Sequence, residues 1–225
     1  MGATSQAWQV EYASGPDPAT ERWPAWPHSA TCLETTFDPV ATFSGPTEAE
    51  NGTGAPEEAL RAYLSEGLHA SLPLKNWRGL SVTESEARFA AGRLGLGLIT
   101  LRLISTDGRW AVSGSPSDCM AQTSSETADA LRWRLQRPQR LHRKTRALRI
   151  DTTVEACRPP PAGDLGREFR SIGRDLVLTV WRERPTGPEP KCLRRTTYSL
   201  TVPLPGNLGK RRVWDGSTYP PRRIG

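Results

Sequence analysis

Three segments in the second half of the chain alternate apolar and polar residues with a period of two. They are IDTTVEA at 150–156, LVLTVWRE at 176–183 and YSLTVPLP at 198–205. This period places successive side chains on opposite faces of an extended strand, so that one face is buried and the other meets water. Strands of this kind are typical of antiparallel sheets. The second half of the chain is therefore predicted to be β-rich.

The first half contains one clear helix pattern, PEEALRAYLSEGLH at 56–69. Pro56 suits the first helical turn, and Glu57 and Glu58 lie where the helix dipole favours anions. A helix of about three turns is predicted. Its apolar side chains share one face at helical spacing, namely Leu60, Tyr63, Leu64 and Leu68.

Strand patterns follow this helix. The stretch LGLGLITLRLIS at 94–105 is apolar and partly β-branched, and Asp107 and Gly108 then precede Trp110 and Val112. An Asp-Gly pair between apolar runs is a strong hairpin signature. A β-hairpin is therefore predicted here.

We expect an α+β fold that is mainly antiparallel β, with one helix near 56–69 and a β-rich second half. Four regions are expected along the chain. They are an acidic, Pro/Gly-rich N-terminal arm over 1–55 with one strand at 31–43, a small α+β unit over 56–130, an Arg-rich linker over 131–149, and a β-rich C-terminal unit over 150–225. The chain has no run of 18 apolar residues, so no transmembrane helix is predicted.

Charge is distributed unevenly along the chain. The first 60 residues hold one basic residue against nine acidic ones, whereas residues 131–225 hold 22 basic against eight acidic. The densest basic stretch, LRWRLQRPQRLHRKTRALR at 131–149, contains no acidic residue. Clusters of this kind bind phosphates. The candidate anion-binding residues are Arg132, Arg134, Arg137, Arg140, Arg143, Lys144, Arg146 and Arg149.

This basic run is open to three interpretations. It is a solvated linker whose charge the acidic arm partly neutralises, or it binds an anionic surface such as phospholipid headgroups or wall polymers, or it binds nucleic acid with Trp133 and His142 as aromatic partners. A helix would place Arg137, Arg140 and Lys144 on one side, but Pro138 interrupts it.

The four cysteines are widely spaced, and none belongs to a C-x-x-C pair. Zinc ligands normally come in such short-range pairs, so neither a metal site nor a cofactor is predicted. Cys157 and Cys192 each lie in a predicted strand end beside a Pro-rich turn and are favoured as one disulfide, which leaves Cys32 with Cys119. Disulfides favour an oxidising compartment, and four reduced thiols in a cytoplasmic protein are the alternative.

The N-terminal sequence MGATSQAWQVEYASG lacks a basic stretch followed by an apolar run, so no signal peptide is expected in this chain. No catalytic motif is recognised either. The histidines at 28, 69 and 142 lie outside any metal or triad motif, and the sequence has no G-x-S-x-G, H-E-x-x-H or P-loop pattern. No catalytic residue is predicted, and the chain is not expected to be an enzyme.

The order of motifs resembles that of a known group of proteins. The segment PEEALRAYL precedes a D-G-x-W-x-V-x-G motif that ends in a cysteine, and VEACRPPPAGD and Tyr-Pro-Pro follow in the second half. The motif residues are Asp107, Gly108, Trp110, Val112, Gly114 and Cys119. This layout, over roughly residues 55–221, resembles small exported, lipoprotein-like proteins of actinobacteria that have no assigned function. The resemblance implies an extracytoplasmic or membrane-associated location rather than an activity.

From these patterns we expect a non-catalytic, exported cell-envelope protein that binds an anionic surface or another protein. The alternative is a cytoplasmic nucleic-acid-binding protein that uses the basic run 131–149.

Overall fold

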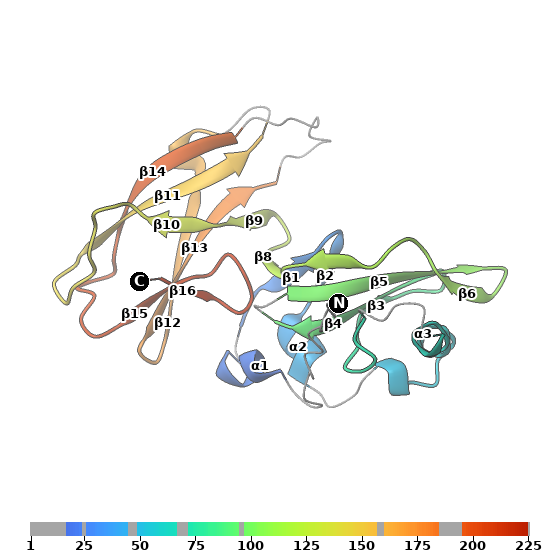
Figure 1. The fold of residues 1–225 in the computed structure, drawn as a ribbon. Coiled ribbons are helices and arrows are strands. Elements are labelled where there is room, and N and C mark those ends of the chain that lie inside the picture. Colours follow the sequence, from blue (N-terminus) through green and yellow to red (C-terminus); the bar gives the residue numbers. More distant parts are fainter. Residues whose placement is uncertain are drawn as a thin grey trace, which may run out of the picture. The chain divides into compact units, whose positions relative to one another are not determined.

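The structure is a computed structural model, and the chain folds into two compact units (Figure 1). The first unit comprises residues 1–27 and 31–121, and the second comprises 28–30 and 122–225. The fold is a β-rich α+β fold with mainly antiparallel sheets, as predicted. The structure describes residues 17–23, 26–44, 49–66, 72–94, 97–156, 160–184 and 195–224.

The first unit is built on a five-stranded antiparallel sheet. Strand β4 pairs with β3 and β5, and β5 also pairs with β6 and β7. The predicted hairpin is the β5–β6 connection, in which Thr106 faces Arg109 and both Asp107 and Gly108 have positive φ. The strands are β3 (Arg78–Val82), β4 (Glu86–Arg93), β5 (Gly97–Thr106), β6 (Arg109–Val112) and β7 (Ser117–Cys119).

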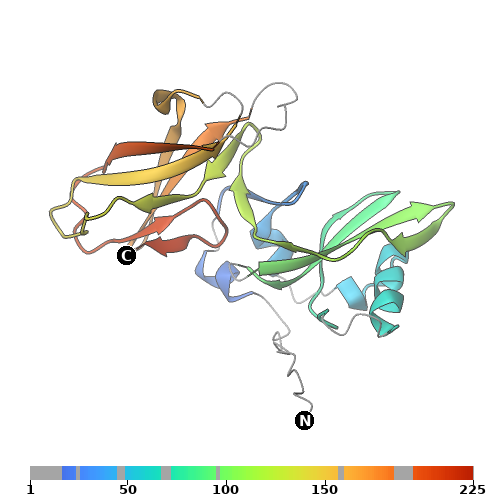
Figure 2. The same ribbon diagram turned by 45° about the horizontal axis from the view of Figure 1, so that its top comes forward.

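One face of this sheet is covered by the predicted helix, α3 (Ala55–Ser65) (Figure 2). Leu60 and Leu64 on its apolar face pack with Trp77, Phe89 and Leu103 in one buried cluster. The helix pattern in the sequence therefore reflects burial against the sheet, which supplies most of the stability of so short a helix.

The N-terminal region differs from the expected acidic arm. Within 17–51 the chain forms α1 (Pro18–Arg22), β1 (Ser29–Cys32), β2 (Thr35–Phe37), α2 (Pro39–Ser44) and the 3-10 turn η1 (Ala49–Asn51). Its aromatic side chains Trp23, Trp26, Phe37 and Phe43 are all buried. Burial of these four rings offsets the entropy of ordering a segment rich in proline and glycine.

The single strand predicted over 31–43 was wrong. The chain turns at Leu33, which has a φ of 55°, and a helix begins at Pro39. The Asp38 carboxylate accepts hydrogen bonds from the backbone N–H groups of Val40 and Ala41 at 2.9 and 3.0 Å. An aspartate followed by a proline is thus a helix start here, because the side chain caps the first turn and proline fits its first position.

The second unit consists of two sheets that enclose one core (Figure 1). One sheet runs in the order β16-β15-β13-β9-β8 with β12 beside β13, and the other in the order β10-β11-β14. The core contains Leu148 and Ile150 from one sheet and Leu176 and Leu178 from the other. The strands of the first sheet are β8 (Gln122–Ser124), β9 (Ala128–Leu131), β12 (Gly166–Ile172), β13 (Asp175–Glu183), β15 (Arg212–Asp215) and β16 (Arg222–Ile224), and a 3-10 turn, η2 (Ala162–Asp164), precedes β12.

Residues 131–149, expected to be an Arg-rich linker, are part of this second unit. They form β10 (Trp133–Leu135), a loop over 136–146 and the start of β11 (Ala147–Glu155), which pairs in turn with β14 (Arg195–Pro203). Trp133, Leu148 and Ile150 are buried, and the arginines between and beside them point outward. The segment therefore alternates buried and exposed residues as strands do, although its many arginines indicated a linker.

Cys32 and Cys119 form a disulfide in the first unit, with their Cα atoms 5.7 Å apart, as predicted. The other predicted pair, Cys157 with Cys192, lies outside the described residues. A disulfide of this kind points to an oxidising environment, since cytosolic thiols are kept reduced. Within the described segments, none of the helices has the length and apolar character needed to cross a bilayer.

Candidate anion-binding surface

All eight basic residues singled out in the sequence are exposed on the second unit. Arg132 and Arg134 flank the buried Trp133 at β10, Arg149 lies on β11, and the other five lie on the loop 136–146. The strand positions follow from the pleat, which turns alternate side chains away from the core.

Neutral side chains hold this loop in place. The Gln139 amide donates to the carbonyl of Ala147 at 2.9 Å and accepts from the N–H of Arg149 at 2.6 Å. The Thr145 hydroxyl accepts from the N–H of His142 at 3.0 Å. The loop backbone is thus fixed by glutamine and threonine, and most of the basic side chains take no part in holding it.

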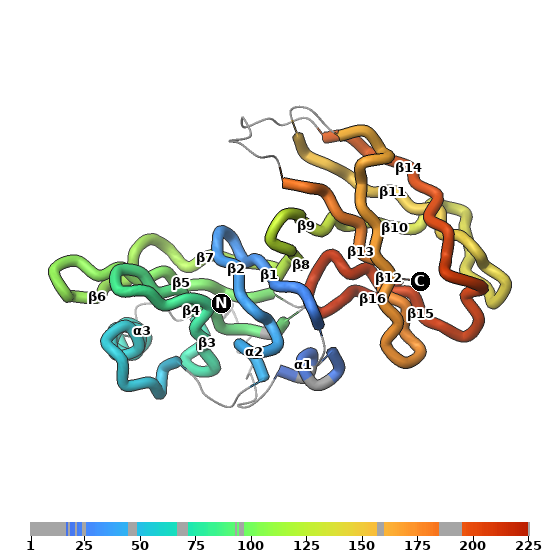
Figure 3. Tube along the Cα trace, turned by 180° about the vertical axis from the view of Figure 1, so that it is seen from behind, coloured from blue at the N-terminus to red at the C-terminus, as the bar shows by residue number. Residues whose placement is uncertain are grey.

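A second loop, 204–211, runs beside the first (Figure 3). The N–H groups of Leu208 and Gly209 donate to the carbonyls of Thr145 and Arg143 at 2.8 and 2.9 Å. This pairing brings Lys210 into the neighbourhood of the basic loop. The sequence analysis did not select the second loop, although its NLGKRR segment is itself basic.

We call the combined set the basic surface. The exposed Arg174, in the turn between β12 and β13, is included because its carbonyl accepts from the N–H of Arg212 at 2.9 Å, and Arg212 directly follows the second loop in sequence. The basic surface comprises Arg132, Arg134, Arg137, Arg140, Arg143, Lys144, Arg146, Arg149, Arg174, Lys210 and Arg211.

Few of these cations have an acidic partner. Among the described residues, Arg134 is the one member of the basic surface that forms an ion pair, with Asp151 at 3.8 Å. The neighbouring Arg212 is different, because it makes two hydrogen bonds to Asp175 at 2.6 and 3.0 Å. The positive charge of the surface is therefore available to a partner.

Trp133, considered above as a stacking partner for bases, is not available for that role. Its side chain is 2% exposed and its indole N–H donates to the carbonyl of Leu178 at 3.0 Å. His142 remains exposed. The basic surface consequently offers charge and hydrogen-bond donors without the tryptophan platform that single-stranded nucleic acids use.

A polar strip adjoins the basic surface on the outer face of β11 and β14. The register pairs Arg149 with Thr201, Asp151 with Ser199, and Thr153 with Thr197, and all of these side chains point away from the core. Sequence reasoning missed this strip, although the period of two in YSLTVPLP already places Ser199 and Thr201 on one face.

Asp151 lies where the strip meets the basic surface. Its carboxylate accepts hydrogen bonds from the Gln136 amide at 2.9 Å and from the Ser199 hydroxyl at 2.8 Å. These two hydrogen bonds, with the nearby charge of Arg134, lower the pKa of Asp151. Asp151 is thus an ionised hydrogen-bond acceptor within a cationic neighbourhood.

Two titratable groups of the second unit, the buried Asp215 and the half-buried His28, have structural partners. Asp215 is fully buried, which raises its pKa, and its carboxylate lies 3.2 Å from the guanidinium of Arg222, which also donates to the carbonyl of Trp133 at 3.0 Å. Burial lowers the pKa of His28, whose Nε2 lies 3.1 Å from a Glu168 carboxylate oxygen. Asp215 and Arg222 thus connect β15, β16 and β10, and His28, the residue before β1, is held against β12.

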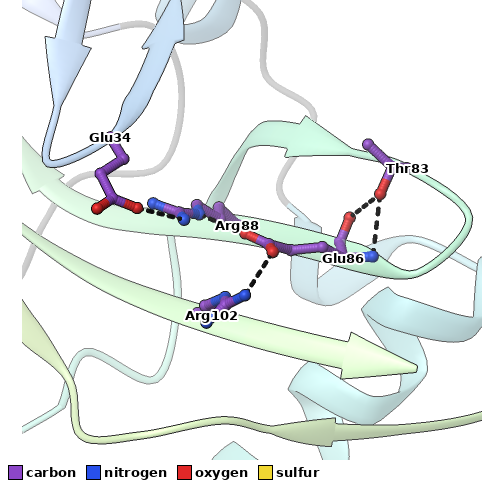
Figure 4. Close-up of polar contacts among 5 residues, drawn as sticks. All are labelled: Glu34, Thr83, Glu86, Arg88 and Arg102. Atoms are coloured by element: carbon purple, nitrogen blue, oxygen red, sulfur yellow. Dashed lines mark hydrogen bonds and ion pairs between the residues drawn. The ribbon is translucent and has the colours of Figure 1, made fainter. Parts of the chain in front are cut away.

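The first unit carries a separate ion-pair network on β4 and β5 (Figure 4). The Glu86 carboxylate accepts from Arg88 Nε at 2.6 Å and from Arg102 Nη2 at 2.7 Å, and Arg88 Nη2 lies 3.4 Å from Glu34. The hydrogen bonds from the two arginines lower the pKa of Glu86 to about 2. The network joins the β1–β2 turn to the sheet.

We predict that Glu86→Gln destabilises the protein at pH 7 by up to about 1 kcal/mol, the range of partly exposed ion pairs. Because the pKa of Glu86 is depressed, its contribution is complete above the ordinary value of 4.5 and is lost as the pH falls toward 2. Urea unfolding at pH 7 and pH 2.5 measures this, with Glu84→Gln, an exposed neighbour, as control. A difference from wild type that is as large at pH 2.5 as at pH 7 would contradict it.

In the portion of the chain that the structure describes, no group of three or more His, Cys, Asp or Glu side chains is placed to hold a metal ion. Comparisons with models of protein families, with curated proteins and with solved structures found no match.

Proposed function

We propose that this protein is a non-catalytic, exported cell-envelope protein that binds an anionic partner through the basic surface of its second unit. The observation that carries the proposal is the set of exposed cations on two hydrogen-bonded loops and the adjoining strands, almost all without an acidic partner. A rigid scaffold that presents charge in this way is typical of binding surfaces.

Two further observations support the location. The Cys32–Cys119 disulfide favours an oxidising compartment. The motif layout of residues 55–221 resembles exported actinobacterial proteins, and on this proposal the anionic partner is a phosphate-bearing component of a cell envelope.

The alternative function is nucleic-acid binding in the cytoplasm. Double-stranded DNA needs no stacking platform, so the burial of Trp133 leaves this alternative open to test. The disulfide favours the envelope over the cytoplasm.

The test is equilibrium binding of the full oxidised chain to fluorescent poly(glycerol phosphate) and to a duplex DNA, followed by anisotropy. We expect binding to the glycerol phosphate polymer at about 50 mM salt that weakens by at least 100-fold at about 200 mM, since each neutralised phosphate releases a counterion. Tighter binding to duplex DNA than to the polymer would favour the alternative. Absence of salt-dependent binding to either probe would refute a role for the basic surface.

A further inference from the structure

We propose that the partner is a linear polymer of polyol or sugar phosphate without bases, whose phosphates bind the basic surface and whose hydroxyl groups bind the neighbouring polar strip. This inference rests on the proposed function and adds to it the chemical class of the partner. The polar strip is defined as Asp151, Thr153, Thr197, Ser199 and Thr201.

The basic surface and the polar strip are continuous along β11 and β14. Arg149 and Thr201 are directly opposite each other on β11 and β14, and Arg134 of β10 is directly opposite Asp151. The polar strip therefore borders cations of the basic surface at both Thr201 and Asp151. From Arg149 to Thr153 the strand advances about 13 Å, at ~3.3 Å per residue. A flexible chain that lies along β11 therefore meets cationic and hydroxyl-bearing positions in succession.

The polar strip presents hydroxyl groups and one carboxylate. The Thr153 and Thr197 hydroxyls lie 3.3 Å apart, and the Ser199 hydroxyl donates to Asp151. Hydroxyl groups can donate and accept, and a carboxylate accepts from partner hydroxyls. A carboxylate beside a phosphate-binding surface repels phosphate, so its presence favours a partner that also carries hydroxyl donors.

The described residues of the second unit include no large apolar side chain with high exposure. The large apolar side chains with high exposure, Leu33, Leu74, Val82 and Met120, all belong to the first unit. Among the described residues of the second unit, no large apolar side chain is therefore highly exposed to enter a bilayer. The buried Trp133 offers no stacking platform, so His142 is the exposed ring of the basic run. The surface chemistry fits a polymer made of phosphates and hydroxyls alone.

The test compares poly(glycerol phosphate) with inorganic polyphosphate at equal phosphate concentration, using the full oxidised chain. We expect the wild type to bind the glycerol polymer about tenfold more tightly, the effect of one or two hydrogen bonds. The double variant Ser199→Ala/Thr201→Val is expected to lose this preference while its affinity for polyphosphate stays unchanged.

Three controls make the outcomes distinct. Ser171→Ala/Thr106→Val removes two exposed strand hydroxyls elsewhere, and Ser199→Thr/Thr201→Ser keeps the hydroxyls of the strip, so both should retain the preference. Thermal melts establish that every variant is folded. Equal wild-type binding to the two polymers, or tighter binding to phosphatidylglycerol vesicles, would overturn this inference and leave the proposed function standing. Tighter binding to poly-uridine RNA would overturn this inference and favour the nucleic-acid alternative. If no polyanion binds, the proposed function itself fails.

Discussion

Replacing Cys32 and Cys119 by alanine is expected to lower the melting temperature of the first unit by roughly 15 °C. The two cysteines are 87 residues apart in sequence, so their disulfide closes a loop that contains most of that unit. Cross-linking so long a loop restricts the unfolded chain and stabilises the folded one by about 4–5 kcal/mol. A loss of that size corresponds to a shift well above 10 °C, at roughly 4 °C or more per kcal/mol in a domain of about 100 residues.

The measurement is calorimetry of the wild type, the double variant and the single variant Cys119→Ala. Genetic variants are preferable to a reductant, because a reductant also acts on any bond that Cys157 and Cys192 make. Hydrogen exchange read by mass spectrometry should show faster exchange in β4 and β5 and unchanged exchange in β11. A melting temperature within 2 °C of wild type would contradict the prediction.

The strands and the long helix were predictable because each buries one face and so carries its period in the sequence. Leu60 and Leu64 specify the buried side of α3, and the Asp-Gly pair specifies the β5–β6 turn through two positive φ angles. Patterns of this kind are local in sequence, so they predict an element even when its packing partner is not known.

The described part of residues 17–51 forms helices and strands in place of the predicted extended arm, for a physical reason. Its proline, glycine and acidic content indicates an extended arm. In the structure, however, α2 follows β2, and the rings of Phe37 and Phe43 pack with their centroids 6.2 Å apart. Burial of four aromatic rings that are scattered in the sequence stabilises this segment. Its helices and strands are too short to show a recognisable hydrophobic period.

The candidate site was predictable in part. Charge alone selected the eight basic residues of 131–149, but not the role of loop 204–211, because the hydrogen bonds from Leu208 and Gly209 to the first loop join segments about 65 residues apart. The polar strip was missed for the same reason. Ser199 and Thr201 gain significance only from the register that sets them opposite Asp151 and Arg149.

The triple variant Arg140→Glu/Arg143→Glu/Lys144→Glu is expected to weaken binding to poly(glycerol phosphate) by at least about 100-fold at low salt. These three side chains are exposed and form no ion pair among the described residues, so their reversal leaves the fold intact. Each cation near an anionic surface contributes about 1 kcal/mol, and reversal adds repulsion to that loss. The dependence of log affinity on log salt should become shallower by about two units or more, since ~0.7 of a counterion is released per contact with a single strand.

A matched control separates this surface from net charge. The variant Arg109→Glu/Arg167→Glu/Arg223→Glu reverses three exposed arginines outside the basic surface and likewise changes the formal net charge from +6 to zero. If binding requires the basic surface, this control retains its affinity within a few-fold, and its salt slope stays at the wild-type value. Equal losses in the two variants would mean that the partner responds to the overall charge of the chain. In that case the arrangement of cations on the two hydrogen-bonded loops has no role in recognition.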